Sequence, residues 1–520
     1  MPSRQLRARQ VREDATQLAF LAPHPIHRSN GDEGRYASRI ASFSKGLGHN
    51  DIGEVEREDY DRLLAAFASE DGADFERIPV SLSPSVPADK RRKLINPQAG
   101  LAFDLEGPDA QALTIPPAPR FNSAEVAAEM AELYWMALLR DTHFEDYGSD
   151  ATAGDAVADL DSMSRFRGPK RGGQVTRATL FRGLTAGDLT GPYVSQFLMR
   201  NFHYGTLRVN AKQQTAKTGV DYLTSFSDWL AAQRGFDSSL DREAQLETDG
   251  SGNLVRRHIR NARDLATYVH YDALYEAYLN ACLILLDEEN ARLDAGNPYE
   301  RSANQAGFGT FGGPHILSLV TEVATRALKA VWFQKWGVHR RLRPEAFGGR
   351  IDVHKRGEAD YPIHDQILDS PVLEAIEAEH GSYLLPQAFP EGSPTHPAYG
   401  AGHATVAGAC TTILKAWFEE TTPIEDLFDP VVVDEDGDGT DDYAGADKSA
   451  MTVGGELDKV AANVAIGRNM GGVHWRSDYT ESIRLGEAIA LGLLREQAET
   501  YNEPFAFSVS LFDGSGVTIG

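Results

Sequence analysis

The sequence predicts a mainly α-helical fold, in which helical bundles with two four-helix-bundle-like cores follow a loop-rich N-terminal region. Two observations support this prediction. In the second half of the chain, apolar residues recur three and four positions apart, the spacing that places side chains on one face of a helix. No segment alternates apolar and polar residues with comparable strength, and no internal repeat of roughly 20–50 residues is present.

The N-terminal region, residues 1–120, contains scattered glycines, prolines and charged turns, and we expect it to pack on subunits or link them. It ends at Pro116, Pro117 and Pro119. The helical domain, residues 121–520, follows. Asn122 and Glu125 have the spacing of a capping box, which predicts a helix that continues to about Leu139.

Residues 145–260 have a mixed pattern, and the helical signal strengthens after them. Pro314 suits the first turn of a helix, where its missing N–H costs no hydrogen bond. Further helices are predicted at residues 264–290, 316–335, 403–419, 455–468 and 477–500.

The composition excludes several classes of protein. Lys and Arg number 51 and Asp and Glu 76, so the net charge is −25, which argues against nucleic acid as a partner. Two cysteines, Cys282 and Cys410, lie in apolar contexts without haem, iron–sulfur or disulfide-framework spacing. No apolar run approaches the ~20 residues of a membrane span. The N-terminus has no convincing signal peptide, and the compartment stays open.

Three segments carry side chains that suit the binding of an oxyanion. Lys335 and Arg343 stand at the end of the long predicted helix, and Pro344 favours a loop conformation for Arg343. Gly402 and His403 begin the next apolar helix, where free backbone N–H groups form an anion site. His403 can deliver or accept a proton there.

The third segment places Arg468 and His474 on either side of a glycine bend. Arg468 offers a rigid fork of donors for a tetrahedral oxyanion, and His474 can bond to its central atom. Asp478 lies four residues on and can hold the other ring nitrogen. Each segment also has a simpler interpretation: a basic helix end with solvated Arg340 and Arg341, a turn with incidental histidines, or a glycine-rich joint. Together the three segments favour an oxyanion site.

These motifs resemble those of the vanadium-dependent haloperoxidases, in particular the red-algal bromoperoxidase type. More distantly they resemble the acid phosphatases that share the same anion pocket. The resemblance extends to segments that begin at Phe103, Leu180 and His270, and it is weakest near the N-terminus.

The resemblance implies a vanadate cofactor with vanadium in the +5 state, bound in a pocket within residues 335–474 of the helical domain. Its residues would have these roles: His474 as axial ligand; Lys335, Arg343, Arg468 and the Gly402 N–H as donors to the equatorial oxygens; and His403, Lys335 and His396 as catalytic residues. The implied reaction oxidises halide with hydrogen peroxide to a hypohalous-acid equivalent, which halogenates small organic molecules. Relatives form homo-oligomers, from dimers to dodecamers.

Two positions depart from the family pattern or give conflicting cues. Ala401 stands where the family usually has serine, so one hydrogen bond to the anion should be missing. His396 is typical of algal bromoperoxidases, whereas Trp332 occurs in chloroperoxidases. We expect bromide and iodide to be favoured, with chloride as a further candidate.

A separate acidic segment follows the oxygen-ligand spacing of calcium loops. Its candidate ligands are Asp434, Asp436, Asp438, Thr440 and Asp442, although the usual glutamate at position 12 is absent. A solvated acidic loop is the alternative. Two other functions also stay open: an acid phosphatase that uses the same pocket, and an oligomeric calcium-binding protein with an impaired pocket.

Overall fold

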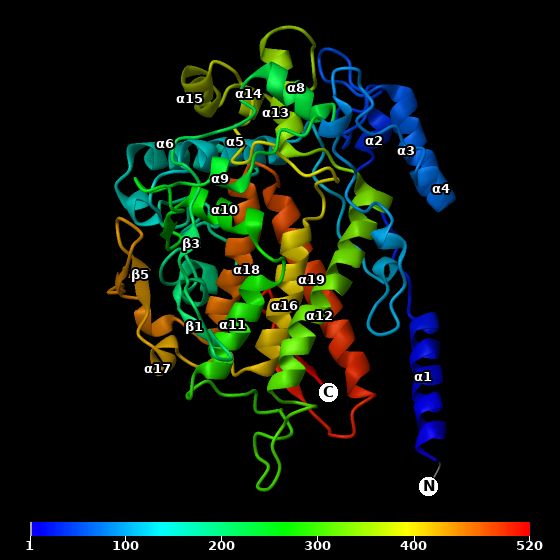
Figure 1. Ribbon diagram of the computed structural model, residues 1–520, viewed down its shortest axis with the longest axis vertical. Helices are drawn as coiled ribbons and strands as arrows, with labels where there is room; N and C mark the ends of the chain where they lie inside the picture. The colour runs from blue at the N-terminus through cyan, green and yellow to red at the C-terminus, as the bar shows by residue number, and fades with distance from the viewer. Residues whose placement is uncertain (1–2) are drawn as a thin grey trace.

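The computed structural model describes residues 3–520 and is mainly helical, as the sequence predicted (Figure 1). Its centre is a bundle of four long helices: α12 (Gly313–Trp332), α16 (Gly402–Trp417), α18 (Val453–Met470) and α19 (Arg476–Ala498). Helix α16 packs against the other three, and all its residues except His403 are buried. His403, in the first turn of α16, is thus the one partly exposed residue of this helix, with a side chain that is 19% exposed.

Two glycines allow α16 and α19 to approach closely. A Cβ atom on Gly408 would lie 1.9 Å from the Ile483 carbonyl oxygen, and one on Gly486 would lie 1.9 Å from the Thr405 carbonyl oxygen. Neither position leaves room for a side chain, because the opposing atoms belong to the backbone. The two helices are thus locked at one separation.

A second helical group packs beside this bundle. It consists of α5 (Ala124–Leu138), α6 (Ala151–Ser162), α14 (Asp365–Leu368) and α15 (Pro371–His380). Helices α10 (Ala262–Tyr271) and α11 (Glu276–Asp287) pack on α18 and α12 respectively. The other α-helices are α1 (Arg4–Leu21), α2 (Asp32–Arg35), α3 (Arg57–Ser69), α4 (Gly72–Phe75), α7 (Gln196–Met199), α8 (Phe226–Gln233), α9 (Arg242–Gln245), α13 (Pro344–Lys355) and α17 (Ile424–Leu427).

In the described part of the chain, residues 3–520, the strands are short and form four two-stranded antiparallel sheets. They are β1 (Phe202–Tyr204) with β2 (Leu207–Val209), β3 (Gln213–Gln214) with β4 (Arg256–Arg257), β5 (Val431–Val433) with β6 (Thr440–Asp442), and β7 (Phe507–Ser510) with β8 (Gly516–Ile519). Short 3-10 turns lie at Ala88–Lys90, Ala99–Leu101, Ala110–Ala112, Phe144–Gly148, Gly187–Leu189 and Lys448–Ala450.

Several element boundaries differ from the sequence prediction. The helix predicted at 264–290 is two helices, because Asp272 adopts an extended conformation (φ −60°, ψ 145°) after α10. The helix predicted to begin at Asn122 is α5, and its N-cap residue is Ser123, since the Ser123 hydroxyl accepts a hydrogen bond from the Val126 N–H. Pro314 lies in the first turn of α12, as predicted.

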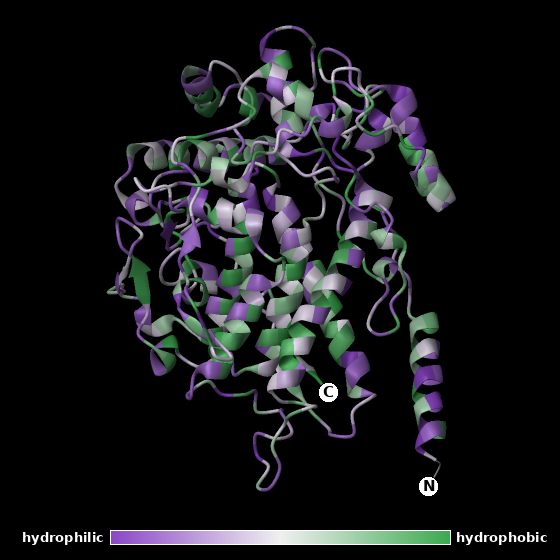
Figure 2. Cartoon of the chain, in the orientation of Figure 1, coloured by the Kyte–Doolittle hydropathy of each residue, from purple (hydrophilic) through white to green (hydrophobic). Residues whose placement is uncertain are grey.

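The N-terminal region is held to the body by a small apolar cluster that joins α3 to the end of α12. Within it, Phe43 and Phe67 pack against the ring of Trp336. Helix α1, by contrast, has no buried residue and stands clear of the body (Figures 1 and 2). No helix within residues 3–520 is both long and apolar enough to cross a membrane.

Candidate functional site

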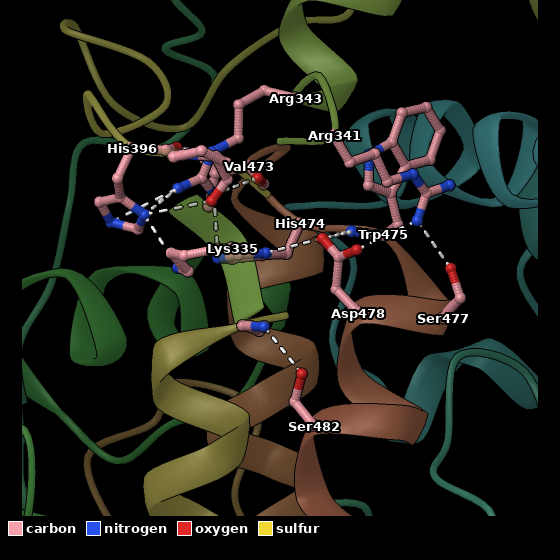
Figure 3. Close-up of polar contacts among 12 residues, drawn as sticks. Lys335, Arg341, Arg343, His396, Val473, His474, Trp475, Ser477, Asp478 and Ser482 are labelled. Atoms are coloured by element: carbon pink, nitrogen blue, oxygen red, sulfur yellow. Dashed lines mark hydrogen bonds and ion pairs between the residues drawn. The ribbon is translucent and has the colours of Figure 1, made fainter. Parts of the chain in front are cut away.

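The three segments singled out in the sequence meet at one end of the central bundle (Figure 3). Lys335 lies in a π-helical turn, η6 (Phe333–His339), which continues α12. Arg343 is the N-cap residue of α13, in the extended conformation that Pro344 favours. Arg468 lies in the last turn of α18, and His474 lies between α18 and α19. Single π-turns inside helices frequently occur at functional sites.

The side chains of this site form a buried cationic cluster. Lys335, Arg343 and Arg468 are 0%, 1% and 7% exposed. The Lys335 Nζ lies 2.9 Å from the His396 Nδ1 atom. One Arg343 Nη atom lies 2.8 Å from the same His396 atom, and the other lies 2.9 Å from the His474 Nε2 atom. Within residues 3–520, these cations therefore contact histidine rings and backbone carbonyls and form no ion pair with a carboxylate.

Burial and mutual repulsion shift the pKa values of the cluster. Burial, followed by the charge of Arg343, holds the pKa of Lys335 well below its ordinary value. Burial, followed by the charges of Lys335 and Arg343, also lowers the pKa of His396, and the same causes lower that of His474. The lowered pKa values favour the neutral form of both imidazoles, whereas burial lowers the pKa of Arg343 only to about 9, so the cluster keeps positive charge.

Arg468 adds a donor without an acceptor. Its Nη1 atom donates to the Val269 carbonyl at 2.9 Å. Its buried Nε atom has no hydrogen-bond partner within residues 3–520. A buried donor without an acceptor is costly. A tetrahedral oxyanion would supply this acceptor and the negative charge that the cluster lacks, so the residues present fit such a group.

Asp478 orients His474, as the sequence predicted. The His474 Nδ1 atom lies 2.8 Å from the Asp478 Oδ2 atom. Burial raises the pKa of Asp478 to about 6, although the charge of Arg341 lowers it. With its proton on Nδ1, the ring presents the Nε2 lone pair to the cationic cluster. The interpretation of Arg341 as a solvated residue is wrong, since its side chain is 4% exposed and contacts Asp478.

His403 has a partner that sequence reasoning missed. Its Nε2 atom lies 3.1 Å from the Asp272 Oδ1 atom. Burial raises the pKa of Asp272, but the charge and hydrogen bond of His403 and the charge of Arg468 together leave the pKa below its ordinary value. Asp272 occupies the break between α10 and α11, so an interruption in the predicted helix was the only signal.

The two residues with conflicting halide cues lie on one wall of the site. The Trp332 ring lies 4.4 Å from the Lys335 Nζ and 4.9 Å from the His396 ring. Its indole N–H donates to the Ile95 carbonyl at 3.1 Å, which fixes the ring plane. A Cβ on Gly402 would lie 3.1 Å from this ring, so the indole also covers the start of α16.

Ala401 lies directly before α16 and is 2% exposed. Its backbone N–H donates to the Ser482 hydroxyl of α19 at 2.8 Å (Figure 3). Position 401 therefore keeps an ordered backbone but offers no side-chain hydroxyl. Sequence reasoning had identified the missing hydroxyl but not the contact with Ser482.

The acidic segment forms a hairpin rather than a wound loop. Val433 of β5 pairs with Thr440 of β6, and the Asp438 carboxylate points to Lys212, with 3.7 Å between the charged atoms. Within residues 3–520, no three His, Cys, Asp or Glu side chains gather as metal ligands. The calcium site stays a prediction from spacing alone, and Asp434, Asp436 and Asp442 have no preformed arrangement for it.

Comparison with known proteins gives consistent matches. Residues 373–503 match the family model for the VCPO second helical-bundle domain. A vanadium-dependent bromoperoxidase of Corallina officinalis is 40% identical, with 97% of this chain and 94% of the relative aligned. One of Ascophyllum nodosum is 37% identical, over 92% and 86% of the two chains. The structure of a homohexameric vanadate-dependent bromoperoxidase of Ascophyllum nodosum has a TM-score of 0.90 at 30% identity, covering 100% of this chain and 91% of that one.

Inorganic phosphate should stabilise the anion-free protein, because it supplies the charge that the cluster lacks. At about 100 times its Kd, phosphate should raise the free energy of unfolding by about 2.7 kcal/mol. Lys335→Met removes one desolvated cation, so this variant should unfold at a higher temperature without phosphate and gain less from phosphate. Thermal unfolding with and without phosphate measures both effects.

Lys45→Met is the matched control for this experiment. Lys45 is also buried, but its Nζ lies 2.9 Å from a Glu345 carboxylate oxygen. Its removal leaves that carboxylate unpaired, so the variant should unfold at a lower temperature and keep its response to phosphate. A phosphate-insensitive unfolding temperature of the unmodified protein would contradict the anion site.

Proposed function

The chain belongs to the vanadium-dependent bromoperoxidase family, and we propose on this basis that it is a haloperoxidase. It oxidises halide with hydrogen peroxide to a hypohalous-acid equivalent, which halogenates small organic acceptors. The observation that carries this proposal is the buried cluster of Lys335, Arg343 and Arg468, whose contacts are neutral rings and backbone carbonyls. Vanadate is a tetrahedral oxyanion, and these residues suit it.

Each pocket residue has a proposed role toward the cofactor. Lys335, Arg343, Arg468 and the Gly402 N–H would hold the vanadate oxygens, while His474 would bind the vanadium through its Nε2 atom, which carries no proton when Nδ1 donates to Asp478. When bound, vanadate supplies a Lewis-acidic centre that activates hydrogen peroxide. The Lys335 Nζ lies beside the His396 ring in the pocket. From there its ammonium group would withdraw electron density from a peroxide oxygen.

His403 is the proposed acid and base of the reaction. Its contact with Asp272 fixes the direction of the ring, and its side chain is the solvent-facing one of α16. The proton on one ring nitrogen is held toward the carboxylate, so the other nitrogen can accept a proton from hydrogen peroxide and return it to a departing oxygen.

Halide selection is proposed to depend on His396 and Trp332. Burial lowers the pKa of His396 and so favours its neutral ring, and the Trp332 ring lies 4.4 Å from the Lys335 Nζ, where it would exclude water. A neutral, partly desolvated wall favours large, weakly hydrated anions, so we infer that bromide and iodide are preferred and that chloride is the slowest substrate.

Two alternatives have less support. An acid phosphatase would use His474 as the nucleophile and His403 as the acid, but the full-length similarity is to bromoperoxidases. A calcium-binding protein with an impaired pocket would need the acidic hairpin to gather ligands, but Asp434, Asp436 and Asp438 lie in its turn and Asp442 on β6, and within residues 3–520 no three His, Cys, Asp or Glu side chains gather as metal ligands. Calcium is therefore at most an additional ligand.

Orthovanadate should switch on bromination of a phenolic dye by the purified protein, given hydrogen peroxide and bromide. His474→Ala should abolish this activity, because it removes the proposed vanadium ligand. Rates with bromide, iodide and chloride rank the influence of Trp332 against that of His396. Inactivity with every halide after vanadate loading, together with phosphate-ester hydrolysis by the apoprotein, would favour the phosphatase instead.

Ala401→Ser should tighten vanadate binding. The new hydroxyl can donate to an anion oxygen, and a hydrogen bond to a charged group contributes about 1.5–3 kcal/mol, which corresponds to a Kd roughly 10- to 150-fold lower. Equilibrium dialysis of the apoprotein against orthovanadate measures this change. An unchanged Kd would mean that a serine hydroxyl at this position does not reach the anion.

We further propose that the protein is a homo-oligomer and that α1 links its subunits. A hexameric bromoperoxidase shares the whole fold, and α1 has no buried residue within its own subunit. Large apolar side chains at its C-terminal end, Leu18 and Phe20, are 63% and 79% exposed. Burial against another subunit would remove this apolar surface from water.

Leu18→Ser with Phe20→Ser should therefore shift the protein to a smaller assembly. Mass photometry at fixed protein concentration measures the shift. The control is Arg9→Ser with Glu13→Ser, which removes an exposed ion pair of the same helix and should leave the assembly unchanged. Equal assembly of both double variants would contradict the linking role of α1.

A further inference from the structure

Arg341 lies on the opposite side of His474 from Lys335 and His396 (Figure 3). Its Nη1 atom donates to the Ser477 hydroxyl at 2.8 Å and to Asp478 at 3.1 Å. Its guanidinium also lies 4.5 Å from the Trp475 ring. The side chain therefore meets the start of α19 but does not reach the oxyanion pocket.

The two oxygens of Asp478 have separate partners. Oδ1 accepts from Arg341 at 3.1 Å. Oδ2 accepts from the His474 Nδ1 atom at 2.8 Å and from the Trp475 backbone N–H at 3.1 Å. A carboxylate turns as one planar unit, so a bond that fixes Oδ1 also fixes the direction of Oδ2 and of the imidazole bonded to it.

Glu129 of α5 holds Arg341 in this position. Its Oε2 atom lies 2.9 Å from the Arg341 Nη2 atom, and its Oε1 atom accepts the Ser477 backbone N–H at 2.6 Å. Both Glu129 and Arg341 are buried, at 5% and 4% exposure of their side chains. The second helical group is thereby tied to the turn that carries His474.

We propose that Arg341, held by Glu129, is a positioning residue for the His474 imidazole. It fixes the Asp478 carboxylate, so that His474 presents its Nε2 atom to the anion at one angle. This role rests on the proposed function, in which His474 binds vanadium. Loss of outer partners of a ligating histidine typically weakens metal affinity about 10- to 100-fold.

Two anions distinguish positioning of His474 from general damage to the pocket. Orthovanadate accepts an imidazole nitrogen as a ligand, whereas phosphate is held in the same cradle by charge and hydrogen bonds alone. A misplaced His474 should therefore weaken vanadate binding more than phosphate binding. A collapsed pocket should weaken both equally.

The test compares Arg341→Gln with the unmodified protein by equilibrium dialysis of the apoprotein against each anion. Arg341→Gln should raise the orthovanadate Kd about 10- to 100-fold and leave the phosphate Kd nearly unchanged. Arg476→Gln is the control. Arg476 is a buried arginine in the first turn of α19, but its Nε atom donates to Glu132 at 2.7 Å. This variant should leave the ratio of the orthovanadate Kd to the phosphate Kd unchanged.

An unchanged orthovanadate Kd in Arg341→Gln, or an equal loss for both anions, would overturn the positioning role. A selective loss that Arg476→Gln reproduces would also overturn it. If Arg341→Gln does not fold, Glu129→Gln with Arg341→Gln removes both charges of the pair together and is judged by the same ratio. Failure of the unmodified protein to bind orthovanadate would overturn the proposed function and this role with it.

Discussion

Lys335, Arg343 and Arg468 are buried without a contacting carboxylate anywhere in residues 3–520, and the rest of the site depends on this constraint. Charged groups are costly to bury unless they are paired, and this protein carries a net charge of −25, so carboxylates are abundant. The fold nevertheless places histidine rings and backbone carbonyls around the cations. Because these cations form no internal ion pairs, a bound anion can stabilise the folded protein by pairing with them.

Carboxylates lie near the cationic cluster, but another side chain separates them from its cations or already pairs with them. Asp478 is separated from Arg343 by the His474 ring, and Glu345 is engaged by Lys45. At that distance the charge of Asp478 partly offsets the lowering of the Lys335 pKa. It thus reduces the repulsion among the cations without occupying the anion position. Neutral imidazoles thus act as spacers between the cationic pocket and the acidic remainder of the protein.

The sequence predicted the helical class from local periodicity. The pocket residues were predicted from three local motifs together with the resemblance to the haloperoxidases, and their roles stay predictions. The pairing of His474 with Asp478 was predictable from local spacing, since four residues make one helical turn. The contact of Arg341 with Glu129 spans 212 positions, and no local pattern encodes it. The site residues that were missed, such as Asp272, act through partners far away in the sequence.

The irregular parts of the helices lie where the chemistry is proposed, and the regular parts give them a fixed frame. Lys335 lies on a π-helical turn, and Asp272 occupies the gap between α10 and α11. Behind them, the glycine contacts between α16 and α19 leave no space for the bundle to slide. A cationic cluster in a softer frame would relax toward the nearest carboxylates. The tight packing of the bundle therefore preorganises the hydrogen-bond donors for an anion before it binds.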